Sequence, residues 1–134
     1  LYACIDCDLL TANLGGDKGL ARDAIAALVE CAATVAPRGK QASFASRARA
    51  SYLLAERGSQ QPRSLAAAFI KPVSRGEADD DLALASVNRI TNFRKQLDTV
   101  YGPCADTTAS FEISNQNTDG SLAEVARFAT ESIA

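Results

Sequence analysis

Two apolar periodicities alternate along this 134-residue chain, and their order restricts the folds that it can adopt. Apolar residues at every second position, typical of half-buried strands, occupy three stretches: residues 1–10, 47–55 and 107–114. Apolar residues at helical spacing occupy four others: 18–36, 62–70, 79–101 and the stretch that begins at Ser121. The predicted order is β-α-β-α-α-β-α, which indicates an α+β domain.

Residues that begin and end helices fit these boundaries. Asp17 is placed to cap the helix of residues 18–36, and Pro37 and Gly39 end it. Ser121 and Glu124 have the spacing of a capping box. Three aspartates, residues 79–81, stand in the first turn of the next long helix, where carboxylates complement the helix dipole. We expect a cap there, with a metal site as the alternative.

The apolar rows of these elements predict which faces are buried. On the helix of residues 18–36 the row consists of Leu20, Ala24, Leu28, Cys31 and Val35. On the final helix it consists of Leu122, Val125, Ala129 and Ile133. On the strand of residues 107–114, Ala109, Phe111 and Ile113 are expected to point inward.

The chain contains four cysteines, and two of them, Cys4 and Cys7, form a C-x-x-C. Residues three apart on a strand point to opposite faces, so this pair is not expected to hold one metal ion. No second pair completes a zinc site. We expect separate thiols of a reduced, cytosolic protein. The sequence does not decide whether Cys31 and Cys104 form a disulfide.

The chain has no histidine, which removes Ser-His-Asp and Cys-His nucleophiles and His-based metal sites. It has no methionine either, so we expect it to be part of a longer chain. No apolar run approaches the roughly 18 residues of a membrane span. We expect a cytoplasmic protein that is not an enzyme and uses no cofactor or metal. An enzyme using Asp6 and Asp8 with Cys4, on one strand face, is the weakest alternative.

Positive charge is concentrated in residues 37–75, which we call the basic segment. It holds eight of the 14 basic residues and one acidic residue, Glu56, and so carries a net charge of +7. The rest of the chain carries −9. Such a concentration is typical of a surface that meets phosphates, and a solvated face of mixed charge is the alternative.

Two arginines of this segment, Arg47 and Arg49, are expected on one exposed face of the strand of residues 47–55. They would then lie about 7 Å apart, close to the spacing of successive phosphates on an extended single strand. The first strand, the first helix and this strand fit half of a ferredoxin-like, RRM-type sheet, a fold that binds single-stranded RNA. Aromatic residues are few there, so we expect basic residues to follow the RNA backbone instead of rings stacking on bases.

Several stretches resemble the CasC family, the repeated backbone subunit of the type I-E CRISPR Cascade complex. The more specific ones are PRGKQASFA at Pro37–Ala45 and PRSLA at Pro62–Ala66. The opening LYACIDCDLL, the Asn-Leu-Gly-Gly loop after it and the alanine-rich helix are also similar. The resemblance spans essentially the whole chain, which corresponds to the C-terminal part of a family member.

The resemblance implies that residues 1–134 are the C-terminal portion of an RRM-like palm with additional helices. It implies a subunit that polymerises along a guide RNA and holds the RNA backbone, while base pairing recognises the target DNA. The implied partners are guide RNA, copies of the same subunit and other Cascade subunits, with no membrane.

The candidate RNA-binding residues come from two sources. Lys40, Gln41 and Ser43 match the family's loop between helix and strand, where contact with RNA phosphate or a neighbouring subunit is implied. Arg38, Arg47 and Arg49 are candidates from their charge and position. The alternative function is a structural module whose basic loop docks an acidic protein partner without RNA.

Overall fold

The structure is a computed structural model that describes residues 1–36, 48–74, 81–114 and 118–133. Its elements, in chain order, are α1 (Cys7–Asn13), α2 (Lys18–Thr34), β1 (Tyr52–Arg57), the 3-10 helix η1 (Ala66–Phe69), α5 (Leu82–Tyr101), β2 (Thr107–Ile113), β3 (Thr118–Asp119) and α6 (Leu122–Thr130). Helices and an antiparallel sheet are both present, so the predicted α+β class is confirmed.

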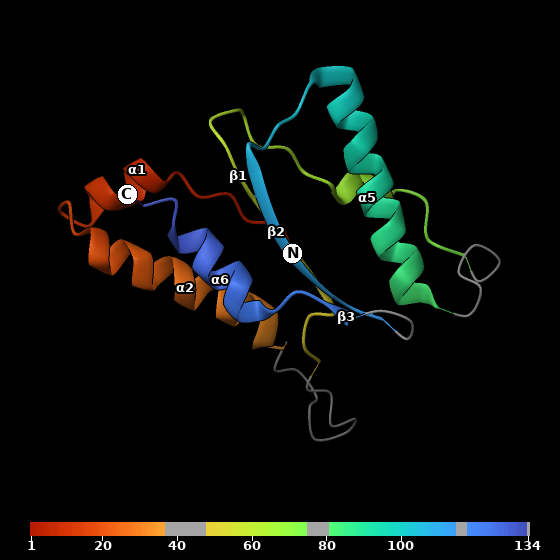
Figure 1. The fold of residues 1–134 in the computed structure, drawn as a ribbon, viewed down its shortest axis with the longest axis horizontal. Helices are drawn as coiled ribbons and strands as arrows, with labels where there is room; N and C mark the ends of the chain where they lie inside the picture. Colours follow the sequence, from red (N-terminus) through yellow and green to blue (C-terminus); the bar gives the residue numbers. More distant parts are fainter. Residues whose placement is uncertain (37–47, 75–80, 115–117, 134) are drawn as a thin grey trace.

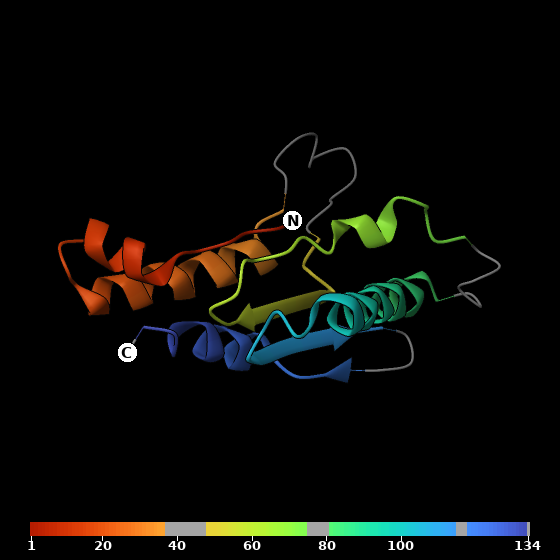
Figure 2. The ribbon, with the colours of Figure 1, turned by 90° about the horizontal axis from the view of Figure 1, so that it is seen from above.

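The sheet has the strand order β1-β2-β3. β1 pairs with β2 from Tyr52 opposite Glu112 to Arg57 opposite Thr107, and the short β3 pairs with the end of β2. Figure 1 shows α2 and α6 on one side of the sheet and α5 with η1 on the other. In the view of Figure 2, α1, α2 and α6 extend toward one end of the molecule and α5 and η1 toward the other. The helices therefore form a layer on each side of the sheet.

The main core lies between the sheet and the α2–α6 pair. Phe111 of β2, Val125 of α6 and Ala33 of α2 are buried together, with Leu53 of β1 packed against them. Val125 is fully buried, so α6 sits directly on the sheet. A second cluster, Ala21, Ile25 and Ile133 with the side chains of α1, joins α1 to α2 and to the end of the chain.

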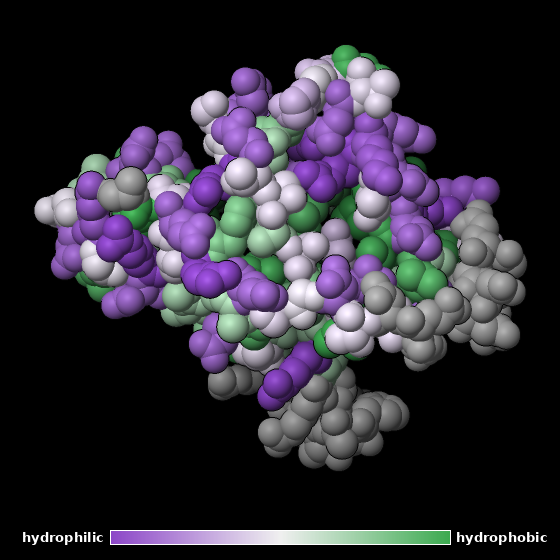
Figure 3. All heavy atoms as spheres, in the orientation of Figure 1, coloured by the Kyte–Doolittle hydropathy of each residue, from purple (hydrophilic) through white to green (hydrophobic). Residues whose placement is uncertain are grey.

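The other face of the sheet carries polar side chains that meet α5. The hydroxyl of Tyr52 shares a hydrogen bond with Thr91 of α5, and the guanidinium Nε of Arg94 donates to Glu56 at 2.6 Å. Burial raises the pKa of Tyr52 above its ordinary value, although the hydrogen bond and the nearby Arg94 act in the opposite direction. On the face of the molecule in Figure 3, hydrophilic side chains gather over α5. α5 is thus held to the sheet by polar contacts and exposes a polar outer side.

The predicted strand at residues 1–10 is wrong, because Cys7–Asn13 form α1 and residues 1–6 pair with no strand. The Asp6 carboxylate accepts a hydrogen bond from the Leu9 N–H and so caps the helix. Leu10 and Leu14, four residues apart, pack with Cys7 against the second core cluster. The same residues therefore fit a helical period, and the core contacts favour it over the strand period.

The predicted buried row of α2 is also wrong. Leu20, Leu28 and Val35 are 50%, 42% and 61% exposed, and Cys31 is exposed too. The buried face consists of Ala21, Ile25 and Ala33. α2 is apolar on two sides, and its smaller residues let α6 approach closely, which periodicity alone does not reveal.

Other local predictions are confirmed. Asp17 caps α2, Ser121 caps α6 through the Glu124 N–H, and Asp81 caps α5 through the Leu84 N–H. The row of α6 faces the core as expected, with Val125 and Ile133 buried. On β2, Phe111 points inward, but Ile113, the last residue of the strand, is 52% exposed. All four cysteines are free, so the structure contains no Cys31–Cys104 disulfide.

No helix in the described ranges is both long and apolar enough to span a bilayer.

Candidate nucleic-acid interface

The chain between α2 and β1, which carries the first part of the basic segment, leaves and re-enters the fold at one place, the end of α2 next to the start of β1. The Val35 N–H caps the last turn of α2 by donating to the Cys31 carbonyl. On the far side of this connection, the Ala50 N–H donates to the Ala33 carbonyl at 2.8 Å. Since Ala33 is buried in the main core, this hydrogen bond fixes where the chain leaves α2 and where it re-enters the sheet. Both described ends of the connection between α2 and β1 are therefore anchored to the same rigid point.

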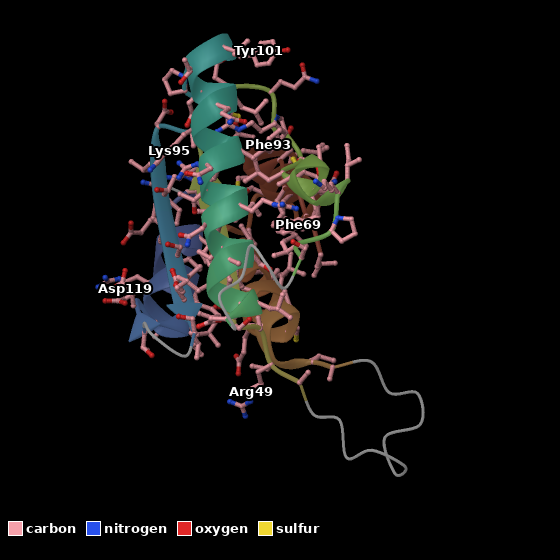
Figure 4. All side chains as sticks on the ribbon, turned by 90° about the vertical axis from the view of Figure 1, so that its right-hand side faces the viewer. Arg49, Phe69, Phe93, Lys95, Tyr101 and Asp119 are labelled. Atoms are coloured by element: carbon pink, nitrogen blue, oxygen red, sulfur yellow. The ribbon has the colours of Figure 1, made fainter. Side chains whose placement is uncertain are left out.

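Five of the six predicted RNA-binding residues lie outside the described residues: Arg38, Lys40, Gln41, Ser43 and Arg47. The sixth, Arg49, is exposed, and Figure 4 shows its side chain clear of α5 and the sheet. Among the described residues, no hydrogen bond or ion pair engages the Arg49 guanidinium. That guanidinium is thus available to an external anion.

The predicted strand position of Arg49 is wrong. β1 begins at Tyr52, because the Ala50 N–H is bonded to α2 and the last contact with β2 is the Ile113 N–H donating to the Ser51 carbonyl. Arg49 therefore precedes the strand instead of standing on it, and Arg47 lies outside the described residues. The 7 Å spacing of the two arginines assumed that both stand on the strand, which does not hold for Arg49.

Two other arginines of the basic segment are engaged inside the protein. Arg57 stacks over the Phe128 ring at 5.0 Å from its centroid and lies 3.9 Å from the Glu131 carboxylate. Arg63 lies 2.7 Å from Asp98 and 3.7 Å from Glu56. These two charges tie β1 and the chain after it to α6 and α5, so they are not candidates for binding RNA.

The side chains of Arg63, Glu56, Arg94 and Asp98 form one half-buried ion cluster between β1, α5 and the chain before η1. Burial alone would lower the pKa of Arg63, but the hydrogen bond and the charge of Asp98, with Glu56, outweigh it and raise the pKa above its ordinary value. Arg63 therefore stays charged, and the cluster acts as a polar clamp that holds α5 against the sheet.

Replacing the central carboxylate of this cluster, Glu56→Gln, is expected to lower the free energy of unfolding by about 1–2 kcal/mol. Glu56 contacts two guanidinium groups, and its side chain is only 20% exposed, so the change leaves positive charge poorly compensated in a half-buried site. Urea denaturation followed by circular dichroism measures the loss.

Glu131→Gln serves as the control for Glu56→Gln. Glu131 is 56% exposed and 3.9 Å from Arg57, so its loss is expected to cost less than about 0.5 kcal/mol. Equal effects of the two substitutions would show that the cluster is no more important than a surface ion pair.

One sign of this cluster is visible in the sequence, since Glu56 is the single acidic residue of the basic segment. Glu56 contacts Arg94, which is 38 residues away in the sequence, and Arg63 contacts Asp98, which is 35 residues away. Local periodicity cannot reveal pairs that are so far apart.

The three residues expected for an enzymatic site do not come together in the structure. Asp6 caps α1, and Cys4 and Asp8 are exposed outside any strand. In the described part of the chain, no group of three potential metal ligands occurs.

Comparison with known proteins gives one informative result. No curated protein matches the chain significantly. The family model of the CT1975-like proteins, a CRISPR-associated (Cas) family, matches residues 1–133. This match covers nearly the whole chain, including the connection between α2 and β1 and both helical layers. It supports the CRISPR association that the sequence predicted, without specifying the type I-E CasC subunit. We conclude that the chain belongs to the CT1975-like family of CRISPR-associated proteins.

Proposed function

We propose that this protein is a non-catalytic subunit of a cytoplasmic CRISPR surveillance complex, and that it holds the phosphate backbone of a guide RNA. The observation that carries the proposal is the hydrogen bond from Ala50 to Ala33, which closes the connection between α2 and β1, with the exposed Arg49 beside this point. Four basic residues, Arg38, Lys40, Arg47 and Arg49, fall between α2 and β1 without an intervening acidic residue. Backbone recognition needs such a group of cations and no base-specific geometry.

The engagement of Arg57 and Arg63 inside the protein sharpens this proposal. It leaves Arg49 and Lys71 as the exposed cations in the described part of the basic segment, and we place the RNA contacts on the chain between α2 and β1, with Gln41 and Ser43 as additional hydrogen-bonding groups. Lys71 lies beyond η1, on the chain that leads to α5, and is not part of the proposed RNA site. The RNA is therefore proposed to cross the end of the sheet where α2 and β1 meet, while target DNA is recognised by pairing with the guide.

Assembly with copies of itself along the RNA, and with other subunits of the complex, is part of the same proposal. The exposed row of α2, with Leu20, Leu28 and Val35 all more than 40% exposed, supports it. Large apolar side chains on one helix face are typical of a surface that another polypeptide covers. Assembly predicts that the number of protein copies per RNA increases with RNA length.

The proposal is tested by measuring the affinity for a guide-length single-stranded RNA across a salt series. Four phosphate contacts predict a slope of about −2.8 in log affinity against log salt, from about −0.7 per contact. Between 50 and 200 mM salt the affinity should fall about 50-fold. The variant Lys40→Ala/Arg47→Ala/Arg49→Ala should bind about 10- to 100-fold more weakly at low salt, with a slope shallower by about 2.

A matched variant removes three exposed positive charges elsewhere: Lys18→Ala/Lys95→Ala/Arg127→Ala. It should keep the wild-type slope to within about one contact. Salt-independent binding, or equal losses in the two triple variants, would contradict the proposed site. Absence of RNA binding by a folded protein would instead favour the alternative that the basic segment docks an acidic protein partner.

A further inference from the structure

The chain between β1 and β2 forms a unit of its own on one face of the sheet. It comprises residues 58–74 and 81–106, with η1 and α5, and we call it the η1–α5 unit. In the described part of the chain, α5 makes its most extensive backbone contacts with η1. Figure 4 shows Phe93 on the side of α5 that faces η1, where Ala67 and Ala68 lie. The two helices therefore pack on each other before either meets the sheet.

This unit leaves and re-enters the sheet at a single point, its base. Arg57, the last residue of β1, lies opposite Thr107, the first residue of β2, and the Asp106 N–H donates to the Arg57 carbonyl at 2.8 Å. A Cβ added at Gly58 would lie 2.9 Å from the Cys104 carbonyl oxygen, so the outgoing and returning chains touch there. A rotation of the unit about this base would leave the pairing of β1 with β2 intact.

The contacts that hold the unit to the sheet differ from those of the core. No described residue of the unit belongs to either of the two core clusters. The hydroxyl of Tyr52 on β1 shares a hydrogen bond with Thr91. Glu56 on β1 takes part in two ion pairs that cross to the unit, with Arg94 at 2.6 Å and with Arg63 at 3.7 Å. The unit can therefore separate from the sheet without opening the core, and Glu56 is the residue that holds it most firmly.

The closed arrangement also carries a cost that separation would remove. Glu112 of β2 lies directly opposite Tyr52, and directly opposite residues of two strands share one face of the sheet. Its Oε1 atom is buried, and no donor among the described residues bonds to it. A buried acceptor without a donor loses the free energy of its hydration, which contact with water restores.

We propose that the η1–α5 unit opens from the sheet as one body, about its base, while the core stays folded, and that Glu56 is its latch. Opening uncovers a polar face of the sheet that carries Tyr52, Glu56 and Glu112. The unit is thus a hinged cover over one face of the sheet. This proposal does not depend on RNA binding.

The test is hydrogen exchange of the backbone amides in the native protein, followed by NMR under conditions in which the rate reports the opening equilibrium. An isolated helix is marginally stable in water, so α5 frays once it is detached and its amides exchange. They should therefore exchange faster than the amides of α6 and β2. Glu56→Gln should raise the α5 rates about 10-fold. Glu131→Gln, which removes an exposed ion pair elsewhere, should change them less than about twofold.

A variant of the core completes the test. Ile25→Val trims a buried residue of α2 and should speed the exchange of the α2 and α6 amides about fivefold. It should leave the α5 rates unchanged, because the core is equally intact before and after the unit opens. Equal acceleration of α5 would show that α5 is released only when the whole protein unfolds, and would overturn the proposal. So would α5 rates that do not respond to Glu56→Gln, or that are as slow as those of β2.

Discussion

Replacing Phe111 by alanine is expected to lower the free energy of unfolding by about 3–5 kcal/mol, a large part of the stability of a domain of this size. Phe111 is 7% exposed and joins three elements, since it packs with Ala33 of α2, Val125 of α6 and the side chains of β1. None of these neighbours can move into the space of the lost ring without separating α6 from the sheet. Guanidinium denaturation, with the midpoint and slope both recorded, measures the loss.

Ile113→Ala is the control for this substitution. Ile113 lies on the same strand but is 52% exposed, so its truncation removes little buried surface and should cost less than about 1 kcal/mol. If the two variants lost similar stability, the core would not be centred on Phe111 and the packing of α6 on the sheet would have to be revised.

Replacing Gly120 by alanine is expected to cost about 2–5 kcal/mol, through two separate effects. Gly120 has a φ of +68°, which costs about 1–2 kcal/mol for a residue with a side chain. A Cβ there would also lie 2.2 Å from the Ser110 carbonyl oxygen and 3.1 Å from the Phe111 Cα. Both atoms belong to the β2 backbone, so β2 and the start of α6 would have to move apart, at a further cost of about 1–3 kcal/mol.

Gly15→Ala separates these two effects. Gly15 has the same φ of +68° but no atom within 4 Å of the added Cβ. Its substitution should therefore cost only the conformational term of about 1–2 kcal/mol, and thermal unfolding of both variants measures the difference. A loss at Gly120 no larger than that at Gly15 would mean that α6 does not approach β2 as closely as the structure shows.

Sequence patterns predicted the elements that are set by local rules. The caps at Asp17, Asp81 and Ser121 were identified correctly, because a capping side chain bonds the backbone only three residues away. The inward position of Phe111 and the buried row of α6 were also correct, since one face of each element is clearly more apolar.

The patterns were wrong where two periods or two faces fit equally well. The first ten residues alternate like a strand, yet Asp6 and the Leu10–Leu14 pair support a helix from Cys7 onward. α2 has two apolar sides, and the choice between them depends on α6, about 90 residues away in sequence. The charge count located the basic segment, but it could not tell Arg49, which is exposed, from Arg63, which pairs with Asp98. Such distinctions depend on tertiary contacts.

The hydrogen bond between Ala50 and Ala33 has a consequence for how this protein can vary among lineages. It joins the end of α2 to the start of β1 through main-chain atoms, which any residue other than proline can supply. Loop-closure entropy changes slowly with length, by about 0.6 kcal/mol for each doubling. Lengthening the chain between these two alanines is therefore expected to add little entropic cost to folding. Natural selection, or an engineer adding a tag, can lengthen that stretch, because the hydrogen bond that joins its two ends does not depend on side chains.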